Sequence, residues 1–327
     1  MQIEIFIKRY PMREPFATSR DVISEIPVIE VHLQDRAGWI GRGEAAGVDY
    51  AGETVESMRD QLLKIKFKVN DVLSPDQLQG LLPAGGARNA LDCALWDLIA
   101  KQHAPQRIWD LLKRPVDRNI QSCFTIGLDN ETRMRQKARA ALQYQCLKVK
   151  VDSKNPLQQI EWVMSEHPSA ELIMDANASL TPEGLIKCMR ALEGSRVTLI
   201  EQPLAVDEDD ILAEIDHLIP IAADESCVDV HSLSSLQGRY DAINIKLDKC
   251  GGLTEGLRLL DHAKSLGYRI MVGNMCGSSL AMAPTWLIAQ EAEWVDLDGP
   301  LLQRVDIEHG IHYQAGTMSA PSAALWG

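Results

Sequence analysis

The stretch IQSCFTI at residues 120–126 is the first of eight short apolar runs that decide the fold. The runs begin 22 to 27 residues apart, and each ends in polar residues. The others are CLKVKVD (146–152), ELIMDAN (171–177), VTLIEQP (197–203), PIAADES (220–226), AINIKLD (242–248), RIMVGNM (269–275) and WVDLDGP (294–300). Helix-like stretches lie between them; in TPEGLIKCMRALEG, Thr181 is predicted to cap a helix with Pro182 in its first turn. Strands and helices that alternate at this spacing form right-handed parallel βα units.

Eight such units predict an α/β fold in which the strands close into a (β/α)8-type barrel. An open doubly wound sheet is the alternative, but it would often carry G-x-G-x-x-G after its first strand. No such motif follows any of the eight runs. Gly251-Gly252 opens a helix after the sixth run, and two glycines alone are weak grounds for an anion site.

The first part of the chain has a different pattern. IPVIEVHLQ (26–34) and WIGRGEA (39–45) read as strand, turn and strand, and ARNALDCALWDLIAKQ (87–102) has apolar residues at helical spacing. This pattern predicts a separate α+β domain. The predicted domains are 1–113 (α+β cap), 114–300 (barrel) and 301–327 (a segment that returns to the cap).

Charge and cysteine content restrict the classes of partner. The chain has 33 lysine and arginine residues against 46 acidic residues, a net charge of −13. Nucleic acid or an anionic membrane would need a basic patch, so neither is expected as the partner. The seven cysteines are odd in number and form no C-x-x-C pair, which favours free thiols in a reducing cytoplasm. The N-terminal sequence MQIEIFIKRY has charges within its apolar run and does not read as a signal peptide.

Three carboxylates follow three consecutive predicted strands. Asp175, Glu201 and Asp224 lie at the ends of the third, fourth and fifth runs. The carboxyl ends of barrel strands carry the chemistry, and neighbouring strands are about 4.8 Å apart. Converging carboxylates repel unless a cation lies among them, and a site of hard oxygen ligands suits Mg²⁺ or Mn²⁺. The alternative is that each acid caps the helix that follows it.

Three lysines accompany the carboxylates. Lys148 and Lys150 are two residues apart and therefore point to the same side of the second strand. Lys246 ends the sixth strand, which lies opposite the second in a ring of eight. Two bases on opposite faces of one carbon can invert it, and nearby metal charge and a second ammonium are predicted to lower the pKa of the base. The alternative is that the lysines only neutralise the carboxylates. Lys249 follows three residues later and is assigned no role.

Five motifs in order, spread over the barrel, resemble the enolase superfamily. They are KVK (148–150), DAN (175–177), EQP (201–203), ADES (223–226) and NIKLDKCGG (244–252). Within it the chain resembles the muconate-lactonising subgroup, and more narrowly the L-Ala-D/L-Glu (dipeptide) epimerases. PAGGARNALDCALWDL (83–98), GRYDAINIKLDKCGGLTE (238–255) and DLDGP (296–300) carry that narrower likeness. The resemblance implies a (β/α)7β barrel with an N-terminal capping domain.

The resemblance also implies a role for each candidate site residue. Lys150 and Lys246 would be the two acid/base residues, and Lys148 would assist Lys150 and touch the substrate carboxylate. Mg²⁺ would be held by Asp175, Glu201 and Asp224. Asp296 and Asp298 would hold the α-ammonium group of a dipeptide, and Arg20 would pair with the glutamate side chain of the substrate. Without the resemblance, the Asp296–Asp298 pair reads as helix caps or solvated loop acids, and Arg20 as a solvated surface residue.

The expected activity is a Mg²⁺-dependent epimerisation of L-Ala-D-Glu to L-Ala-L-Glu in murein peptide recycling or catabolism. One alternative uses the same site for o-succinylbenzoate synthesis, cycloisomerisation or N-acyl amino acid racemisation, whose substrates carry no ammonium group. Another is a non-catalytic ligand-binding barrel, which predicts an incomplete set of bases or ligands. Members of the family often form homo-oligomers, and this is an expectation for the chain.

Overall fold

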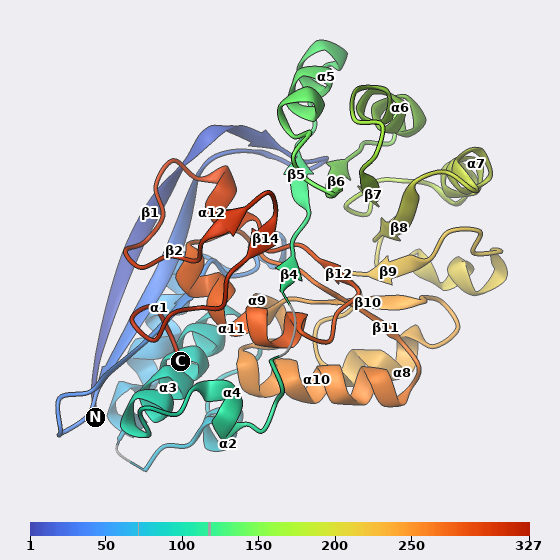
Figure 1. Ribbon diagram of the computed structural model, residues 1–327. Coiled ribbons are helices and arrows are strands. Elements are labelled where there is room, and N and C mark those ends of the chain that lie inside the picture. Colours follow the sequence, from blue (N-terminus) through green and yellow to red (C-terminus); the bar gives the residue numbers. More distant parts are fainter. Residues whose placement is uncertain (71, 117–118) are drawn as a thin grey trace.

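The computed structural model describes residues 1–70, 72–116 and 119–327. An antiparallel sheet in the order β1-β2-β3 forms the N-terminal part. Its strands are β1 (Gln2–Ala17), β2 (Val22–Gln34) and β3 (Ile40–Ala45), followed by η1 (Asp49–Ala51), α1 (Val55–Ile65), η2 (Lys66–Lys68), α2 (Pro75–Leu78), α3 (Gly86–Gln102) and α4 (Ile108–Leu111). Figure 1 shows β1 and β2 as a long hairpin that reaches from this part across to the barrel near β5 and β6. The sequence predicts β2, β3 and α3 but not β1.

Helix α3 packs closely on β3 because two glycines face it. A Cβ atom at Gly41 would collide with the carbonyl oxygen of Ala94, and one at Gly43 with that of Ala90. The helix is buried along most of its length, since the cap sheet covers one side and the barrel the other. α3 is therefore one of the elements through which the cap meets the barrel.

The barrel sheet is parallel and has the strand order β12-β11-β10-β9-β8-β7-β6-β5. Its strands are β5 (Phe124–Ile126), β6 (Cys146–Lys150), β7 (Glu171–Asp175), β8 (Val197–Glu201), β9 (Ile221–Ala223), β10 (Ala242–Ile245), β11 (Arg269–Val272) and β12 (Trp294–Val295). Each lies within one of the eight predicted runs, which confirms them as strands. The two edges meet where Cys123 N donates to Val295 O at 2.8 Å.

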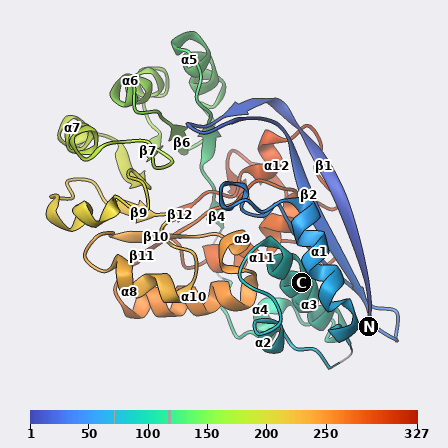
Figure 2. The same ribbon diagram turned by 180° about the vertical axis from the view of Figure 1, so that it is seen from behind.

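The connections form the outer layer of the barrel (Figures 1 and 2). They are α5 (Glu131–Ala140), α6 (Pro156–Glu166), α7 (Pro182–Leu192), η3 (Asp209–Glu214), η4 (Val230–Ser232), α8 (Leu233–Leu236), α9 (Leu247–Cys250), α10 (Leu253–Ser265) and α11 (Ser279–Ala289). The predicted cap of α7 is confirmed, because Thr181 Oγ1 accepts from Gly184 N at 3.1 Å. The link between β8 and β9 contains the 3-10 helix η3 where the pattern predicts an α-helix.

One layer of side chains fills the barrel interior beneath the strand ends. Its members come from around the ring and are Cys123, Ile173, Leu199, Ala222, Ala242, Met271 and Trp294. Ile173, Leu199 and Ala222 each lie two residues before a candidate metal ligand. Because side chains alternate along a strand, the three carboxylates point into the barrel as the next layer.

The chain after the barrel contacts both parts of the protein. It contains α12 (Gly299–Leu302), β13 (Tyr313–Gln314) and β14 (Thr317–Met318). β13 pairs with β14, and β14 pairs with β4 (Ile120–Gln121). Gln303 forms a bridge to Met12 of β1. Arg42 of β3 donates to the carbonyl oxygens of Ala324 at 2.9 Å and Leu325 at 2.7 Å. Within the described residues no helix is long and apolar enough to cross a membrane.

Candidate active site

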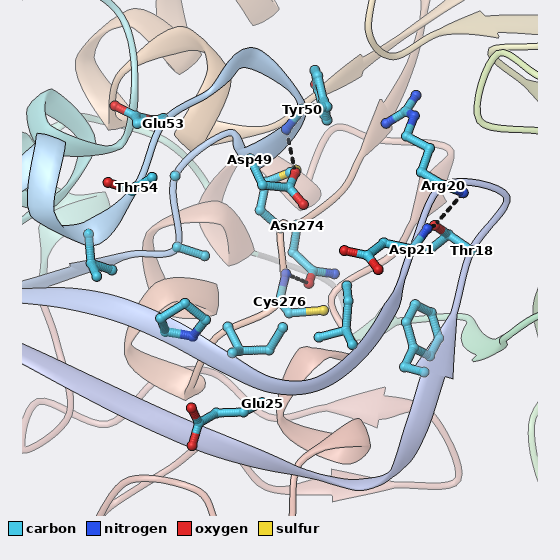
Figure 3. Close-up of a pocket in the computed structure, with 18 of the residues that line it drawn as sticks. Thr18, Arg20, Asp21, Glu25, Asp49, Tyr50, Glu53, Thr54, Asn274 and Cys276 are labelled. Atoms are coloured by element: carbon cyan, nitrogen blue, oxygen red, sulfur yellow. Dashed lines mark hydrogen bonds between the residues drawn. The ribbon is translucent and has the colours of Figure 1, made fainter.

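A cavity of about 570 Å³ lies where the cap covers the carboxyl ends of the barrel strands. Lys150, Asp224 and Lys246 line it from the barrel, and Arg20 and Tyr50 line it from the cap. Figure 3 shows Arg20 on the turn between β1 and β2 and Tyr50 on the facing loop of the cap. The predicted bases therefore share one cavity with two polar side chains of the cap.

The three predicted metal ligands come from neighbouring strands. Asp175 on β7 is in register with Glu201 on β8, and Glu201 is in register with Ala222, two residues before Asp224. All three carboxylates are almost completely buried. The structure thus brings together the acids that the sequence singles out.

The ammonium group of Lys148 lies among buried carboxylates. Its Nζ atom is 3.0 Å from Asp175 Oδ2, 2.8 Å from Glu201 Oε2 and 2.8 Å from Asp296 Oδ2. Lys150 Nζ, on the same side of β6, is 2.6 Å from Asp175 Oδ2 and 3.0 Å from the side-chain oxygen of Asn177.

Two lysines approach Asp224 from the other side of the barrel. Lys246 Nζ is 2.7 Å from Asp224 Oδ2. Lys249 Nζ is 2.6 Å from Asp224 Oδ1 and 3.1 Å from the carbonyl oxygen of Asn244, and it also contacts the carbonyl oxygen of Asp224. β6 and β10 are separated by β7, β8 and β9 in the sheet order, so Lys150 and Lys246 lie on opposite walls of an eight-strand ring.

The carboxylates differ in how well they are neutralised. Burial raises the pKa of Asp175, but Lys148 and Lys150 outweigh it, and the pKa falls below its usual value. The pKa of Asp224 is likewise lowered, against burial, chiefly by Lys246 and Lys249. Burial and the neighbouring Asp175 raise the pKa of Glu201 to about 7. Of these three acids, Glu201 is therefore the one whose negative charge is least stabilised by its neighbours.

The carboxylates of the site act on the pKa of Lys246 in the direction opposite to the lowering that the sequence predicts from a metal ion and a second ammonium. Burial lowers the pKa of Lys246, but Asp224 outweighs burial and the net shift is upward. The pKa of Lys148 is raised in the same way by Asp175, Asp296 and Glu201, against burial. The neighbouring carboxylates therefore favour the charged form of both Lys246 and Lys148.

The side chains fit a hard divalent cation by their chemistry. In residues 1–70, 72–116 and 119–327, no three acidic, histidine or cysteine side chains stand as a ready-made metal cluster. Asp175 and Glu201 instead contact the ammonium of Lys148, and Asp224 contacts those of Lys246 and Lys249, so all three carboxylates already face positive charge. No described group donates a well-directed hydrogen bond to Glu201 Oε2, although Lys148 Nζ lies 2.8 Å away. A buried acid with a spare oxygen and a raised pKa suits a metal ligand.

Asp296 and Asp298 follow β12 and are buried behind the cavity wall. Asp296 is paired with Lys148, and Asp298 Oδ2 accepts from Thr125 N at 2.6 Å. Burial and the neighbouring Asp296 raise the pKa of Asp298 to about 8. Neither aspartate is among the described residues that line the cavity, whereas Asn274, which donates to the carbonyl oxygen of Asp296 at 2.6 Å, is one of them.

Arg20 reaches the barrel from the tip of the hairpin. Its guanidinium group forms an ion pair with Glu225 and donates to the carbonyl oxygen of Asn177 at 3.3 Å. It also lies 4.7 Å from the ring centroid of Tyr50. About a third of its side chain is exposed (34%). The structure thus places Arg20 at the cavity, where its guanidinium group is already paired with Glu225.

Some residues of the site are not predicted from the sequence. Asn244 Nδ2 donates to Glu201 Oε1 at 2.7 Å, and its signal is its position two residues before Lys246, on the same side of the strand. Tyr50 comes from the short helix η1, whose sequence carries no chemical signal. In the segment after β11, the side chains of Asn274, Met275 and Cys276 line the cavity. Ser278 instead donates to Glu44 of the cap at 2.7 Å.

Comparison with protein families agrees with this architecture. The family model described as mandelate racemase / muconate lactonizing enzyme, N-terminal domain, matches residues 1–112. The model described as enolase C-terminal domain-like matches residues 132–324. The chain belongs to the mandelate racemase / muconate lactonizing enzyme family of the enolase superfamily. This confirms the resemblance inferred from the five motifs and the predicted fold class.

Two curated relatives narrow the comparison to enzymes named for glutamate derivatives. The chain is 35% identical over 318 residues to the L-Ala-D/L-Glu epimerase of Escherichia coli (strain K12), a match that covers 97% of this chain and 98% of the relative. It is 42% identical over 251 residues to the N-acetyl-D-glutamate racemase of a Pseudoalteromonas species, covering 77% of this chain and 79% of the relative.

Solved structures give the same picture. An enolase family member from Agrobacterium tumefaciens with homology to dipeptide epimerases, solved with sodium and L-Ala-L-Glu, is 35% identical with a TM-score of 0.96 over 99% of both chains. A dipeptide epimerase from Methylococcus capsulatus, complexed with Mg and L-Arg-D-Lys, is 26% identical with a TM-score of 0.88, over 98% of this chain and 96% of its own.

Proposed function

We propose that this protein is a Mg²⁺-dependent epimerase that interconverts L-Ala-D-Glu and L-Ala-L-Glu at the α-carbon of the C-terminal residue. The observation that carries the proposal is that Lys150 and Lys246 line one cavity from opposite strands of the barrel. The name of the Escherichia coli relative, L-Ala-D/L-Glu epimerase, and the L-Ala-L-Glu bound in the Agrobacterium tumefaciens structure support glutamate as the residue that is inverted.

Inversion needs one proton to leave one face of the α-carbon and another to arrive at the opposite face. In one direction Lys150, as the neutral amine, takes the proton, and Lys246, as the ammonium, supplies one; the roles reverse in the other direction. The electron pair of the broken C–H bond is held as an enolate and returns to the carbon when the second proton arrives. Lys148 assists Lys150 and contacts the substrate carboxylate.

Asp175, Glu201 and Asp224 would hold the Mg²⁺. When bound, the ion stabilises negative charge on the substrate carboxylate and offsets the carboxylates that hold the lysines charged. Mn²⁺ would suit the same oxygen ligands.

The remaining candidate residues are proposed to select the substrate. Asp296 and Asp298 supply two carboxyl groups behind the wall formed by Asn274, and they would hold the α-ammonium group of a dipeptide. Arg20 would exchange Glu225 for the side-chain carboxylate of the substrate glutamate. A planar guanidinium group suits either carboxylate.

A second candidate activity is racemisation of N-acetylglutamate, and the 42% identity to the Pseudoalteromonas enzyme favours it. The same two lysines would invert the same carbon. The substrates differ at the other end, because an N-acetyl group has no ammonium for Asp296 and Asp298 to hold. The two activities are therefore separable by substrate.

Proton exchange in D₂O tests both candidates. L-Ala-L-Glu, L-Ala-D-Glu, N-acetyl-L-glutamate and a small dipeptide panel are incubated with enzyme and Mg²⁺, and the α-proton is followed by NMR. We expect deuterium at the C-terminal α-carbon of both Ala-Glu diastereomers and no epimerisation by K150A or K246A. Absence of deuterium in every dipeptide would overturn the proposal, and exchange in N-acetylglutamate alone would replace it with the second candidate.

We also propose a setting for the activity. The substrate is a murein peptide fragment, which suggests cell-wall peptide recycling or catabolism. The seven free cysteines support a reducing cytoplasm as the location. We propose that residues 1–113 form the cap, 114–300 the barrel and 301–327 the returning segment, and that the protein assembles as a homo-oligomer.

A further inference from the structure

The buried arginine Arg88 of the cap helix α3 grips the end of a short barrel helix. Its side chain is 7% exposed. The guanidinium group donates to the carbonyl oxygens of Cys250 at 2.6 Å and Gly251 at 3.1 Å, at the end of α9. It also donates to the carbonyl oxygen of Leu82 in the cap, at 3.3 Å. A cation at the C-terminal carbonyls of a helix satisfies acceptors that the helix leaves unpaired.

One turn further along α3, Asp92 holds the segment that follows. Its side chain accepts from Thr254 N at 2.9 Å and from Thr254 Oγ1 at 2.6 Å. Gln79 of the cap donates to the same carboxylate at 3.1 Å. α3 therefore grips the barrel segment at two points that are four residues apart on one helix face.

The glycine pair of the NIKLDKCGG motif is explained by this contact. Gly251 and Gly252 have φ angles of +82° and +115°, which L side chains rarely adopt. A Cβ atom at Gly251 would collide with the Arg88 guanidinium, and one at Gly252 with the Asp92 side chain. The two glycines thus pack against oppositely charged cap side chains, Arg88 at Gly251 and Asp92 at Gly252, and the Asp92 carboxylate accepts from Thr254 N at the start of α10.

The segment that α3 grips carries two of the lysines of the site. Lys246 is the residue before α9, and Cys250 N and Gly251 N donate to Lys246 O and Leu247 O at 3.1 and 2.8 Å. Lys249 lies within α9 and contacts Asp224. A single turn of helix moves as a unit, so displacement of its C-terminal end also displaces both lysines.

We propose that Arg88 and Asp92 are positioning residues, by which the cap helix α3 fixes α9 and so sets Lys246 against the α-carbon of the substrate. This inference rests on the proposed function. Lys150 lies on β6, which α9 does not include. Loosening the grip therefore impairs proton transfer on the Lys246 face more than on the Lys150 face, whereas a purely structural contact would impair both faces alike.

The test measures α-proton exchange in D₂O from each Ala-Glu diastereomer separately, for wild type, Arg88→Lys and the milder Asp92→Asn. The diastereomer that loses exchange in K246A identifies the face served by Lys246. Lysine lacks the planar guanidinium group of arginine, so its single ammonium group cannot donate to the carbonyl oxygens of Cys250 and Gly251 in the same geometry. We expect exchange on the Lys246 face to fall about 10-fold to 100-fold in Arg88→Lys, and by less on the Lys150 face, about 3-fold at most.

Arg107→Lys is the matched control, because Arg107 also donates to carbonyl oxygens, those of Gly327, Pro321 and Trp326, but does not contact α9. It should leave the ratio of the two exchange rates unchanged. Equal losses on both faces in Arg88→Lys, or no loss on either, would overturn the proposal. Wild-type protein without exchange on either face would instead overturn the proposed function.

Amide hydrogen exchange of the metal-free protein supplies a readout that does not depend on activity. The peptide covering 247–252 should exchange faster in Arg88→Lys than in wild type, by about 10-fold or more, which corresponds to roughly 1.4 kcal/mol. Arg107→Lys should match wild type in this peptide. Unchanged protection of the peptide in Arg88→Lys would overturn the inference on its own.

Discussion

Replacing Lys249 by methionine tests whether this buried lysine holds Asp224, one of the three proposed metal ligands, in place. Lys249 is 3% exposed, and its ammonium group contacts both the carboxylate and the carbonyl oxygen of Asp224 as well as the carbonyl oxygen of Asn244. Methionine retains most of the apolar stem and removes only the charge and its donors. The substitution thus isolates the polar part of the contact.

The expected loss in the free energy of unfolding depends on which partners Asp224 keeps after the substitution. Removing one member of a buried ion pair costs about 3–5 kcal/mol, because the other charge stays buried. Lys246 still lies 2.7 Å from Asp224 Oδ2, so the carboxylate keeps one partner. We therefore expect Lys249→Met to lower the free energy of unfolding by about 3 kcal/mol, the lower end of that range.

Urea unfolding of the metal-free protein, followed by circular dichroism, measures the loss. The control is Lys137→Met, because Lys137 and Asp129 form a pair at 3.1 Å that is partly exposed. Exposed pairs contribute about 0–1 kcal/mol. If Lys249→Met costs no more than the control, Lys249 does not hold Asp224 as described.

Three further predictions use other features of the structure. Mg²⁺ should raise the free energy of unfolding by about 2.7 kcal/mol at 100 times its dissociation constant, and Glu201→Gln should abolish most of the resulting midpoint shift in a thermal-shift titration. The hydrogen bond that His217 donates to the Asp241 carboxylate raises the pKa of His217 above its usual value. Since the protonated form is stabilised in the folded state, the stability lost in His217→Gln should be greatest below pH 6.5 and should shrink as the pH rises through the folded pKa, as urea midpoints at several pH values will show. Gly252→Ala should destabilise the protein by about 2 kcal/mol or more, whereas Gly238→Ala, with φ +78° and open space around it, should cost only about 1–2 kcal/mol; comparable losses in both would contradict the packing described for Gly252.

The barrel and the residues at its strand ends follow from local patterns. Each strand is an apolar run of limited length, and the side-chain period of two places Asp175 and Glu201 on the inward face. The ring order of the strands then fixes which side chains face each other. This is why Lys150, Lys246 and the three carboxylates could be predicted to share a site.

The rest of the site depends on contacts between distant segments. The first half of β1 alternates, with Ile3, Ile5 and Ile7 on one face, but the second half contains Pro11 and is exposed along much of both faces, so the sequence does not predict the full strand. Tyr50 and Arg20 reach the cavity only because the cap docks on the barrel. The raised pKa of Lys246 arises from Asp224, and no sequence spacing supplies the distance between the two side chains.

The hairpin that carries Arg20 has a mechanical consequence. The register of β1 and β2 shifts between Pro11 and Phe16, and Arg20 lies in the turn beyond. The six residues from Met12 to Ala17 span about 20 Å at roughly 3.3 Å each. A swing of about 5° at the bend therefore moves the tip by about 1.7 Å over that length. A substitution at the bend is therefore expected to move Arg20, the proposed partner of the substrate side chain, and to leave Lys150 and Lys246 in place on the barrel.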